Sequence, residues 1–247
     1  MKKVKPKKYK KIESFDFLPG RVLARKYEIL KKLGQGWQGE VYLIREKNTG
    51  IERAAKFFFP HRNEKDKTAI ADAKKMHALR NCPNLIQYHT QETIRYQGFN
   101  VTALVSDYVD GELLSTFLQK QPEQRLQLFE GLHLLYTIVT GVEQFHFLSE
   151  YHGDLHTDNV MVKRMGLGFD IKIFDPFHWG GSKKQNIQED VFDVIRIFYE
   201  SIGGKKHYAS QPKIAKTICC GLKKSLIAQK FKNASDLKLF LETMEWE

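Results

Sequence analysis

The segment of residues 151–162 constrains this chain more than any other part of its sequence. Asp154 and Asn159 stand five positions apart in it, after a long apolar pattern and directly before a strand-like run. Asp175 follows Asn159 by sixteen positions, at the end of a second strand-like run. Phosphoryl transfer needs one carboxylate to orient the attacking hydroxyl, and an amide and a second carboxylate to hold Mg²⁺ against the phosphates. The order and spacing of these three residues therefore predict a site of that chemistry.

A glycine-rich run lies more than a hundred residues earlier. Gly34, Gly36 and Gly39 form a G-x-G-x-x-G pattern, which also marks dinucleotide-binding folds. Glu52 stands near the position of a ribose-binding acid, so spacing alone leaves that alternative open. In dinucleotide-binding folds the glycines open a helix, whereas β-branched and aromatic residues follow here at 41 and 42. This context favours a glycine hairpin that lies over phosphates, with an ordinary Gly-rich turn as the plain alternative.

Lys56 is the third element of the pattern. It follows Gly39 by seventeen positions, within the strand-like run 54–59. A lysine at this strand position pairs with the α- and β-phosphates of a nucleotide in kinases. A solvated lysine is the alternative for any single lysine of a chain that has 40 lysines and arginines, and the spacing from the glycines favours the functional interpretation.

The apolar periodicity divides the chain into two parts. The first hundred residues predict five strands and one helix, the helix over about residues 65–79. Beyond them, apolar residues recur at helical spacing over 124–148, and further helical patterns follow in 191–199, 213–226 and 235–244. A small strand-rich lobe therefore precedes a larger helical one, with the break near residues 110–111.

With these motifs in hand, the sequence resembles a eukaryotic-like Ser/Thr protein kinase over about residues 27–246. The resemblance implies an α+β, bilobal protein-kinase-like fold that forms one catalytic domain. Residues 21–109 would form an N-lobe of five antiparallel strands and one helix, and residues 110–247 a mainly helical C-lobe. Residues 1–20 would be a basic, flexible tail.

The resemblance also implies ATP and Mg²⁺ as cofactors and assigns roles to residues. Asp154 would act as the base, His156 would contact the transferring phosphate, and Asn159 and Asp175 would bind Mg²⁺. The segment 104–109 resembles the hinge that offers backbone groups to adenine, and Asp190 resembles the anchor of the catalytic loop. The nucleotide-binding residues implied in this way are Gly34, Gln35, Gly36, Gly39, Val41, Ala54, Lys56, Asp107 and Val109.

Several positions depart from the protein-kinase pattern. Gly153 replaces the arginine of His-Arg-Asp, and His156 replaces a lysine, so His-Gly-Asp-Leu-His is similar to the loop of aminoglycoside and choline kinases. Asp175-Pro176-Phe177 replaces Asp-Phe-Gly. The stretch from Asp175 to Asp190 is short and lacks Ala-Pro-Glu, which indicates a shortened activation segment without control by loop phosphorylation. The helix that should supply a glutamate to Lys56 offers Asp72 as the nearest acid.

Three functions remain open at this point. The first is a protein kinase that acts on Ser or Thr hydroxyls of a protein substrate. The second is a kinase of a small hydroxylated molecule, favoured by the His-Gly-Asp-Leu-His string and the short segment after Asp175. The third is a pseudokinase that binds nucleotide as a scaffold, and the survival of Lys56, Asp154, Asn159 and Asp175 argues against it.

Charge and cysteine content bear on location and partners. Residues 1–11 carry seven lysines and no acid, so they supply +7 of the formal net charge of +11 and leave +4 for the rest. Such a tail is either a solvated leader or an arm for an anionic surface or nucleic acid. It lacks the apolar core of a signal peptide, and no apolar run has the length of a membrane span. The three cysteines lack metal-ligand spacing, and an intracellular, cytoplasmic setting is expected.

Overall fold

The computed structural model describes residues 11–166 and 168–245, which form two compact units. Within these described residues, the first unit comprises 11–73 and Tyr88–Tyr108, and the second comprises Lys74–Gln87, 109–166 and 168–245. Helix α1 (Lys67–Ala78) therefore contributes its first residues to one unit and its last residues to the other. The expected lobes, 21–109 and 110–247, did not anticipate that residues 74–87 belong with the second unit. The predicted basic arm lies largely in residues 1–10, outside the described residues.

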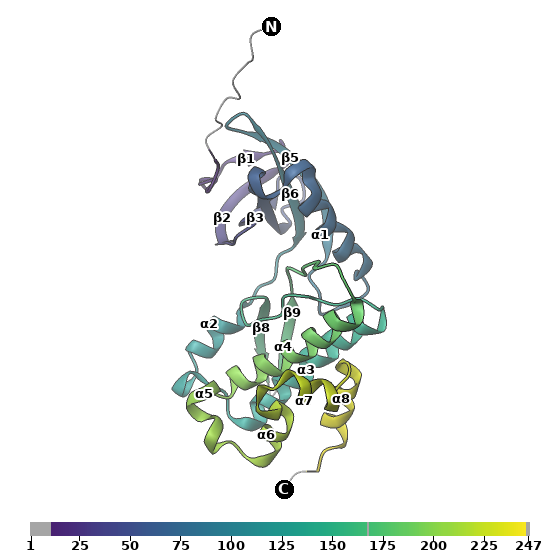
Figure 1. Ribbon diagram of the computed structural model, residues 1–247. Helices are drawn as coiled ribbons and strands as arrows, with labels where there is room; N and C mark the ends of the chain where they lie inside the picture. The colour runs from purple at the N-terminus through teal and green to yellow at the C-terminus, as the bar shows by residue number, and fades with distance from the viewer. Residues whose placement is uncertain (1–10, 167, 246–247) are drawn as a thin grey trace. The chain divides into compact units, whose positions relative to one another are not determined.

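The first unit is built on a six-stranded antiparallel sheet with the strand order β1-β2-β3-β4-β6-β5 (Figure 1). The strands are β1 (Val22–Leu23), β2 (Tyr27–Gln35), β3 (Gly39–Glu46), β4 (Glu52–Phe58), β5 (Tyr88–Tyr96) and β6 (Phe99–Asp107). The prediction of five strands missed β1. That strand has two residues, which is too few to show the alternation of apolar and polar side chains that identifies a strand.

An aromatic cluster fills one face of this sheet, and part of it comes from the segment before β1. Phe15 is fully buried and its ring lies 5.4 Å from that of Phe59, while Phe17 lies 5.1 Å from Phe57. The Tyr96 hydroxyl donates a hydrogen bond of 2.7 Å to the Phe15 carbonyl. The expectation of a flexible tail over residues 1–20 is therefore wrong for its described part, because Ile12, Phe15 and Phe17 remove their apolar surface from water.

The same segment covers a buried carboxylate at the start of β3. Glu40 is fully buried and accepts hydrogen bonds from the Ser14 hydroxyl, the Phe15 amide and the Tyr42 hydroxyl. Lys32 on β2 adds an ion pair of 2.7 Å. Burial alone would raise the pKa of Glu40, but the hydrogen bonds from Lys32, Tyr42 and Ser14 outweigh it and lower the pKa. Residues 14–15 thus help to hold the strand that follows the glycine-rich turn.

The second unit is mainly helical, with a three-stranded sheet of order β7-β8-β9 (Figure 1). Its strands are β7 (Glu112–Leu113), β8 (Val160–Met165) and β9 (Gly168–Ile173). Its helices are α2 (Leu114–Gln119), α3 (Leu128–Phe147), α4 (Lys183–Ser201), α5 (Gly204–His207), α6 (Lys213–Cys219), α7 (Lys224–Lys230) and α8 (Ala234–Thr243). None of the helices in the described residues combines the length and apolar composition needed to cross a membrane.

Helix α3 is the centre of this unit. Its apolar face packs against α4, α8 and β9, and Leu135, Val139 and Val142 are buried there. A capping box between Gln127 and Glu130 starts the helix, because each side chain binds the backbone amide of the other residue. The helix predicted over 124–148 is therefore confirmed in its main part. Its end at Phe147 delivers the chain into the segment that carries Asp154.

The packing of the N-terminal segment gives a first testable prediction. Phe15→Ala should destabilise the protein by about 3–5 kcal/mol, because it removes a fully buried aromatic side chain and leaves a cavity. Leu18→Ala is the matched control, since Leu18 is 73% exposed and its loss should change stability by less than about 0.5 kcal/mol. Urea denaturation of both variants measures the difference. Equal stabilities would show that residues 12–17 do not belong to the folded domain.

Candidate active site

The glycine-rich run forms a hairpin between two antiparallel strands. Gly34 on β2 lies opposite Val41 on β3, Gln35 lies opposite Glu40, and the Gly36 amide donates to the Gly39 carbonyl over 2.9 Å. A side chain at Gly39 would collide with the carbonyl oxygen of Phe57, whereas Gly34 and Gly36 have open space beside them. The turn leads into a strand and not into a helix, which removes the dinucleotide-binding alternative.

Lys56 lies in the middle of β4, opposite Val41 on β3 and Leu104 on β6. Its ammonium nitrogen is 3.6 Å from the nearer carboxylate oxygen of Asp72 on α1, and these side chains are only 18% and 11% exposed. The ammonium also donates to the side-chain oxygen of Gln38 in the glycine turn. The sequence left open whether the shorter Asp72 reaches Lys56, and in the structure the two form an ion pair.

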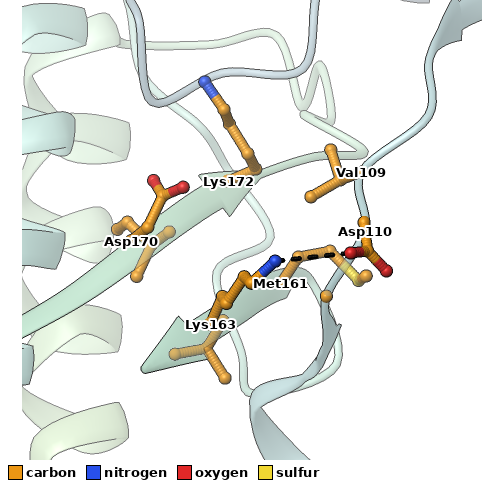
Figure 2. Close-up of a pocket in the computed structure, with 9 residues that line it drawn as sticks. Val109, Asp110, Met161, Lys163, Asp170 and Lys172 are labelled. Atoms are coloured by element: carbon orange, nitrogen blue, oxygen red, sulfur yellow. Dashed lines mark hydrogen bonds and ion pairs between the residues drawn. The ribbon is translucent and has the colours of Figure 1, made fainter. Parts of the chain in front are cut away.

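The two hinge residues named by the sequence lie on either side of the division between the units. Asp107 ends β6, and one of its carboxylate oxygens accepts from Arg53 at 3.1 Å and contacts the His89 ring at 2.6 Å. Val109 lines a small hollow beside β8 and β9, where Lys163 pairs with Asp110 at 3.3 Å (Figure 2). This hollow has a volume of about 20 Å³, enough for about one water molecule and too small for a nucleotide.

The loop before β8 brings three of the predicted residues together. The Asn159 side-chain amide donates to the Asp154 carbonyl over 2.8 Å and lies 3.4 Å from an Asp154 carboxylate oxygen. The His156 ring is 3.8 Å from that same oxygen, and its other nitrogen accepts the Asp158 amide at 3.2 Å. The Asp154 side chain is 51% exposed, so it stands at the surface of the unit.

Asp175 reaches the same loop through the backbone. It follows β9, and the amide of the preceding Phe174 donates to the Asn159 carbonyl over 3.1 Å. Asp175 has a φ of 59°, a left-handed backbone conformation that is uncommon for residues other than glycine. The structure therefore brings Asp154, His156, Asn159 and Asp175 to one region of the second unit.

A buried histidine and a buried aspartate fix the backbone of the loop that carries Asp154. Asp190 on α4 is fully buried and accepts the amides of His152 at 2.6 Å and Gly153 at 2.8 Å. The His152 ring donates from Nε2 to the Phe174 carbonyl over 2.9 Å, and its Nδ1 accepts the Asp154 amide over 3.2 Å. Because Nδ1 is an acceptor, the ring is neutral, and burial accordingly lowers the pKa of His152.

The residues present fit a magnesium ion bound together with phosphates. Mg²⁺ prefers oxygen ligands and is held in proteins by few side chains plus substrate phosphates. Since the nitrogen of the Asn159 amide is taken up by the Asp154 carbonyl, the amide oxygen remains as an acceptor for a cation. Among the described residues no group of three or more His, Cys, Asp and Glu side chains is arranged to hold a metal by itself. The oxygen donors of Asn159 and Asp175 are thus of the kind that Mg²⁺ accepts when phosphate oxygens supply further ligands.

Two residues, one in each unit, contact the predicted site residues or the backbone near them and were not found from the sequence. Gln38 contacts Lys56 from the glycine turn, and Lys75 on α1 contacts the backbone beside Asp154 and Asp175. Gln38 lies within the glycine pattern at a position where any residue fits the motif. Lys75 gives no signal in the sequence, because it is one of three lysines of α1 and directly follows the exposed Lys74.

Comparison with known proteins identifies the family. The family profile described as the protein kinase domain matches residues 27–217 of this chain. The matched range covers more than half of the chain and includes the glycine hairpin, Lys56, the Asp154 loop and Asp175. The chain belongs to the protein kinase family.

Individual relatives agree with this assignment at low identity. Cyclin-dependent kinase B2-2 of Arabidopsis thaliana is 29% identical over 192 residues, which cover 74% of this chain and 60% of that protein. CBL-interacting protein kinase 21 of Oryza sativa subsp. japonica is 31% identical over 157 residues, covering 61% of this chain and 27% of that protein. The chain thus spans less than two thirds of the length of these curated relatives.

The fold agrees with solved kinase structures. A double mutant of the Mycobacterium tuberculosis PknI kinase domain superposes with a TM-score of 0.66 at 16% identity, covering 92% of this chain and 97% of that one. A single mutant of the same domain gives a TM-score of 0.67. The predicted protein-kinase-like α+β fold is confirmed at this level.

The neutral state of His152 gives a prediction of pH dependence. An unfolded histidine titrates near about 6.5, so below that pH the unfolded chain binds a proton that folded His152 does not. Stability from this residue is present above about pH 6.5 and is lost as the pH falls, by up to about 1.4 kcal/mol per pH unit.

His152→Gln keeps a donor and an acceptor but does not titrate. Denaturant unfolding at pH 7.5 and at pH 5.5 should show that the wild type loses more stability than the variant over this interval. A difference between the two proteins that does not change with pH would mean that His152 binds its proton equally well in both states.

Proposed function

We propose that this chain is an ATP- and Mg²⁺-dependent protein kinase that phosphorylates Ser or Thr hydroxyls of a protein. The observation that carries the proposal is the joint placement of Asp154 and Asn159. The Asn159 side-chain nitrogen donates to the Asp154 carbonyl over 2.8 Å and lies 3.4 Å from an Asp154 carboxylate oxygen, so the carboxylate and the amide side chain are held next to each other. These are the two groups that phosphoryl transfer requires for the attacking hydroxyl and for the metal.

In this proposal each group has one task. The glycine hairpin of Gly34, Gly36 and Gly39 covers the phosphates with backbone amides, and Lys56, oriented by Asp72, binds the α- and β-phosphates. The metal supplies charge neutralisation of the phosphates when it is bound by Asn159 and Asp175. The remaining nucleotide-binding residues proposed are Gln35, Val41, Ala54, Asp107 and Val109.

Asp154 orients the acceptor hydroxyl and accepts its proton. Its carboxylate is half exposed, which leaves it accessible to a substrate. In this proposal His156, whose ring lies 3.8 Å from this carboxylate, donates to an oxygen of the transferring phosphoryl group. The tie between the Asp154 amide and the His152 ring fixes the backbone from which Asp154 projects.

The activation segment is short in this proposal. After Asp175 the chain enters α4 already at Lys183, so residues 176–182 are the whole connection. No Ala-Pro-Glu motif occurs in it, and Gly153 offers no arginine for a phosphorylated loop. We infer an activity that does not depend on phosphorylation of this segment.

A second candidate is a kinase of a small hydroxylated molecule. Two observations favour it: the His-Gly-Asp-Leu-His string of the Asp154 loop and the short connection to α4, which offers little backbone for a peptide to pair with. Both candidates use the same catalytic groups. They differ in the acceptor, which the experiment must therefore vary.

The deciding experiment measures phosphate transfer by the purified full chain. The protein is incubated with Mg-ATP, with and without a generic basic protein, and both proteins are analysed by intact mass. Asp154→Asn should lower the rate by at least about 100-fold, because the base is lost, and Asp175→Ala should abolish transfer because a metal ligand is lost. Asp170→Asn, an exposed carboxylate on β9, is the matched control and should keep wild-type activity.

Each outcome selects one function. Phosphate on either protein, absent in Asp175→Ala and after chelation of the metal, supports the proposed protein kinase. ATP turnover that appears only with small hydroxylated compounds supports the second candidate. Nucleotide binding without transfer to any acceptor would overturn both and leave a nucleotide-binding scaffold.

A further inference from the structure

Lys75 is a buried lysine that contacts the backbone on both sides of the candidate catalytic groups. It lies on α1, three residues after Asp72, and only 7% of its surface is exposed. Its ammonium group donates to the His152 carbonyl over 3.0 Å and to the Phe177 carbonyl. A buried ammonium is stable only when its charge is compensated by its surroundings, and hydrogen bonds from a charged donor are among the stronger ones in proteins.

The ring of Tyr151 is part of the environment of this ammonium. The nitrogen of Lys75 lies 3.9 Å from the ring centroid, which is a close cation–π contact in a site with little water. Tyr151 is itself 1% exposed. Lys75 therefore contacts two consecutive residues before Asp154, through the side chain of residue 151 and the carbonyl of residue 152, and it also contacts the carbonyl of residue 177.

The two carbonyls that Lys75 binds lie at equal sequence distances from the two candidate catalytic carboxylates. His152 stands two residues before Asp154, and Phe177 stands two residues after Asp175. The two segments also bind each other directly, because the Phe177 amide donates to the His152 carbonyl over 2.9 Å. Lys75 thus closes a small ring of hydrogen bonds that joins the backbone of the Asp154 loop to the backbone after Asp175.

Gly153 is part of the same arrangement. It has a φ of 89°, and a Cβ atom added to it would lie 2.6 Å from the Phe177 carbonyl oxygen. The oxygen that Lys75 holds therefore occupies the space into which a side chain at position 153 would have to extend. The indole of Trp179 donates to the Gly153 carbonyl and fixes the segment further along.

We propose that Lys75 is a positioning residue, which joins the Asp154 loop to the segment after Asp175 and so orients both carboxylates for phosphoryl transfer. This inference rests on the proposed kinase activity. In this role Lys75 acts through the backbone carbonyls of residues 152 and 177. Position 153 is a glycine here, so no side chain extends from it. Lys75 of helix α1 links the two backbone segments beside this position.

Kinetics of three variants test the proposal. Lys75→Met and Lys75→Gln should lower kcat by about 10- to 100-fold, because misplaced catalytic groups slow the chemical step. The KM for ATP should stay within about twofold, since the residues proposed to bind nucleotide are unchanged. Lys75→Arg should restore most of kcat, because a guanidinium can donate to two carbonyls. Lys74→Met, an exposed neighbour on the same helix, is the matched control.

Hydrogen exchange gives a readout that does not depend on activity. The Phe177 amide should exchange at least about tenfold faster in Lys75→Met and Lys75→Gln, while the amides of β8 and β9 should keep their wild-type rates. This local increase also distinguishes a loosened cross-link from a protein that fails to fold, in which all amides would exchange faster.

The outcomes separate the two levels of the argument. Wild-type activity in a folded Lys75→Met, or an equal loss in Lys74→Met, would overturn the positioning role. If the wild type transfers no phosphate but Phe177 exchange still rises in the Lys75 variants, the kinase proposal fails and the cross-link stands. Unchanged exchange at Phe177 would overturn the cross-link whatever the activity.

Discussion

The buried carboxylate of Asp190 is the interaction on which the candidate site depends. A buried carboxylate needs hydrogen bonds in place of its hydration, and here two backbone amides of the Asp154 loop donate to it. The His146 ring approaches the same carboxylate at 3.3 Å and accepts the Ala234 amide with its other nitrogen. Helices α3, α4 and α8 are therefore linked through this one side chain, and its hydrogen bonds restrict the conformation of the Asp154 loop.

Further backbone hydrogen bonds link Asp190 to the rest of the candidate site. His152, whose amide binds Asp190, uses both ring nitrogens to fix Phe174 and the Asp154 amide. Catalytic carboxylates need exposure to substrate, and exposed side chains are mobile. When the backbone that carries such side chains is held rigidly, the side chains can be exposed and still keep a defined position. The interior of the second unit supplies the rigidity, while Asp154 itself remains at the surface.

Much of this could be predicted from the sequence, because phosphoryl transfer ties residue types to fixed spacings. The distance from Asp154 to Asn159 and the arrival of Asp175 at a strand end depend on local chain geometry. Long periodic segments such as α3 were also predictable, since their apolar spacing is unambiguous. Strand β1 was missed because two residues carry no period.

Other features depend on contacts between segments far apart in the chain. The reach of Asp72 to Lys56 is decided by how close α1 lies to β4, which no spacing encodes. The role of Lys75 depends on carbonyl oxygens, and every residue has one, so the sequence cannot distinguish a lysine that binds two of them. The apolar residues at 12, 15 and 17 were hidden by the lysines before them, which made the whole segment look like a solvated tail.

The buried N-terminal segment has a consequence for how this domain is delimited. The family profile begins at residue 27, yet the hydrogen bonds that hold Glu40 beside the glycine hairpin come partly from residues 14 and 15. Residues 14 and 15, which lie outside the range matched by the family profile, thus stabilise the glycine hairpin, which lies inside it. A shortened protein that begins at residue 27 would keep all the kinase motif residues. It would lose the hydrogen bonds from Ser14 and Phe15 to Glu40 next to the glycine hairpin. Conversely, kinases with the same motifs can differ in the stiffness of the glycine hairpin when they differ in the residues that precede position 27.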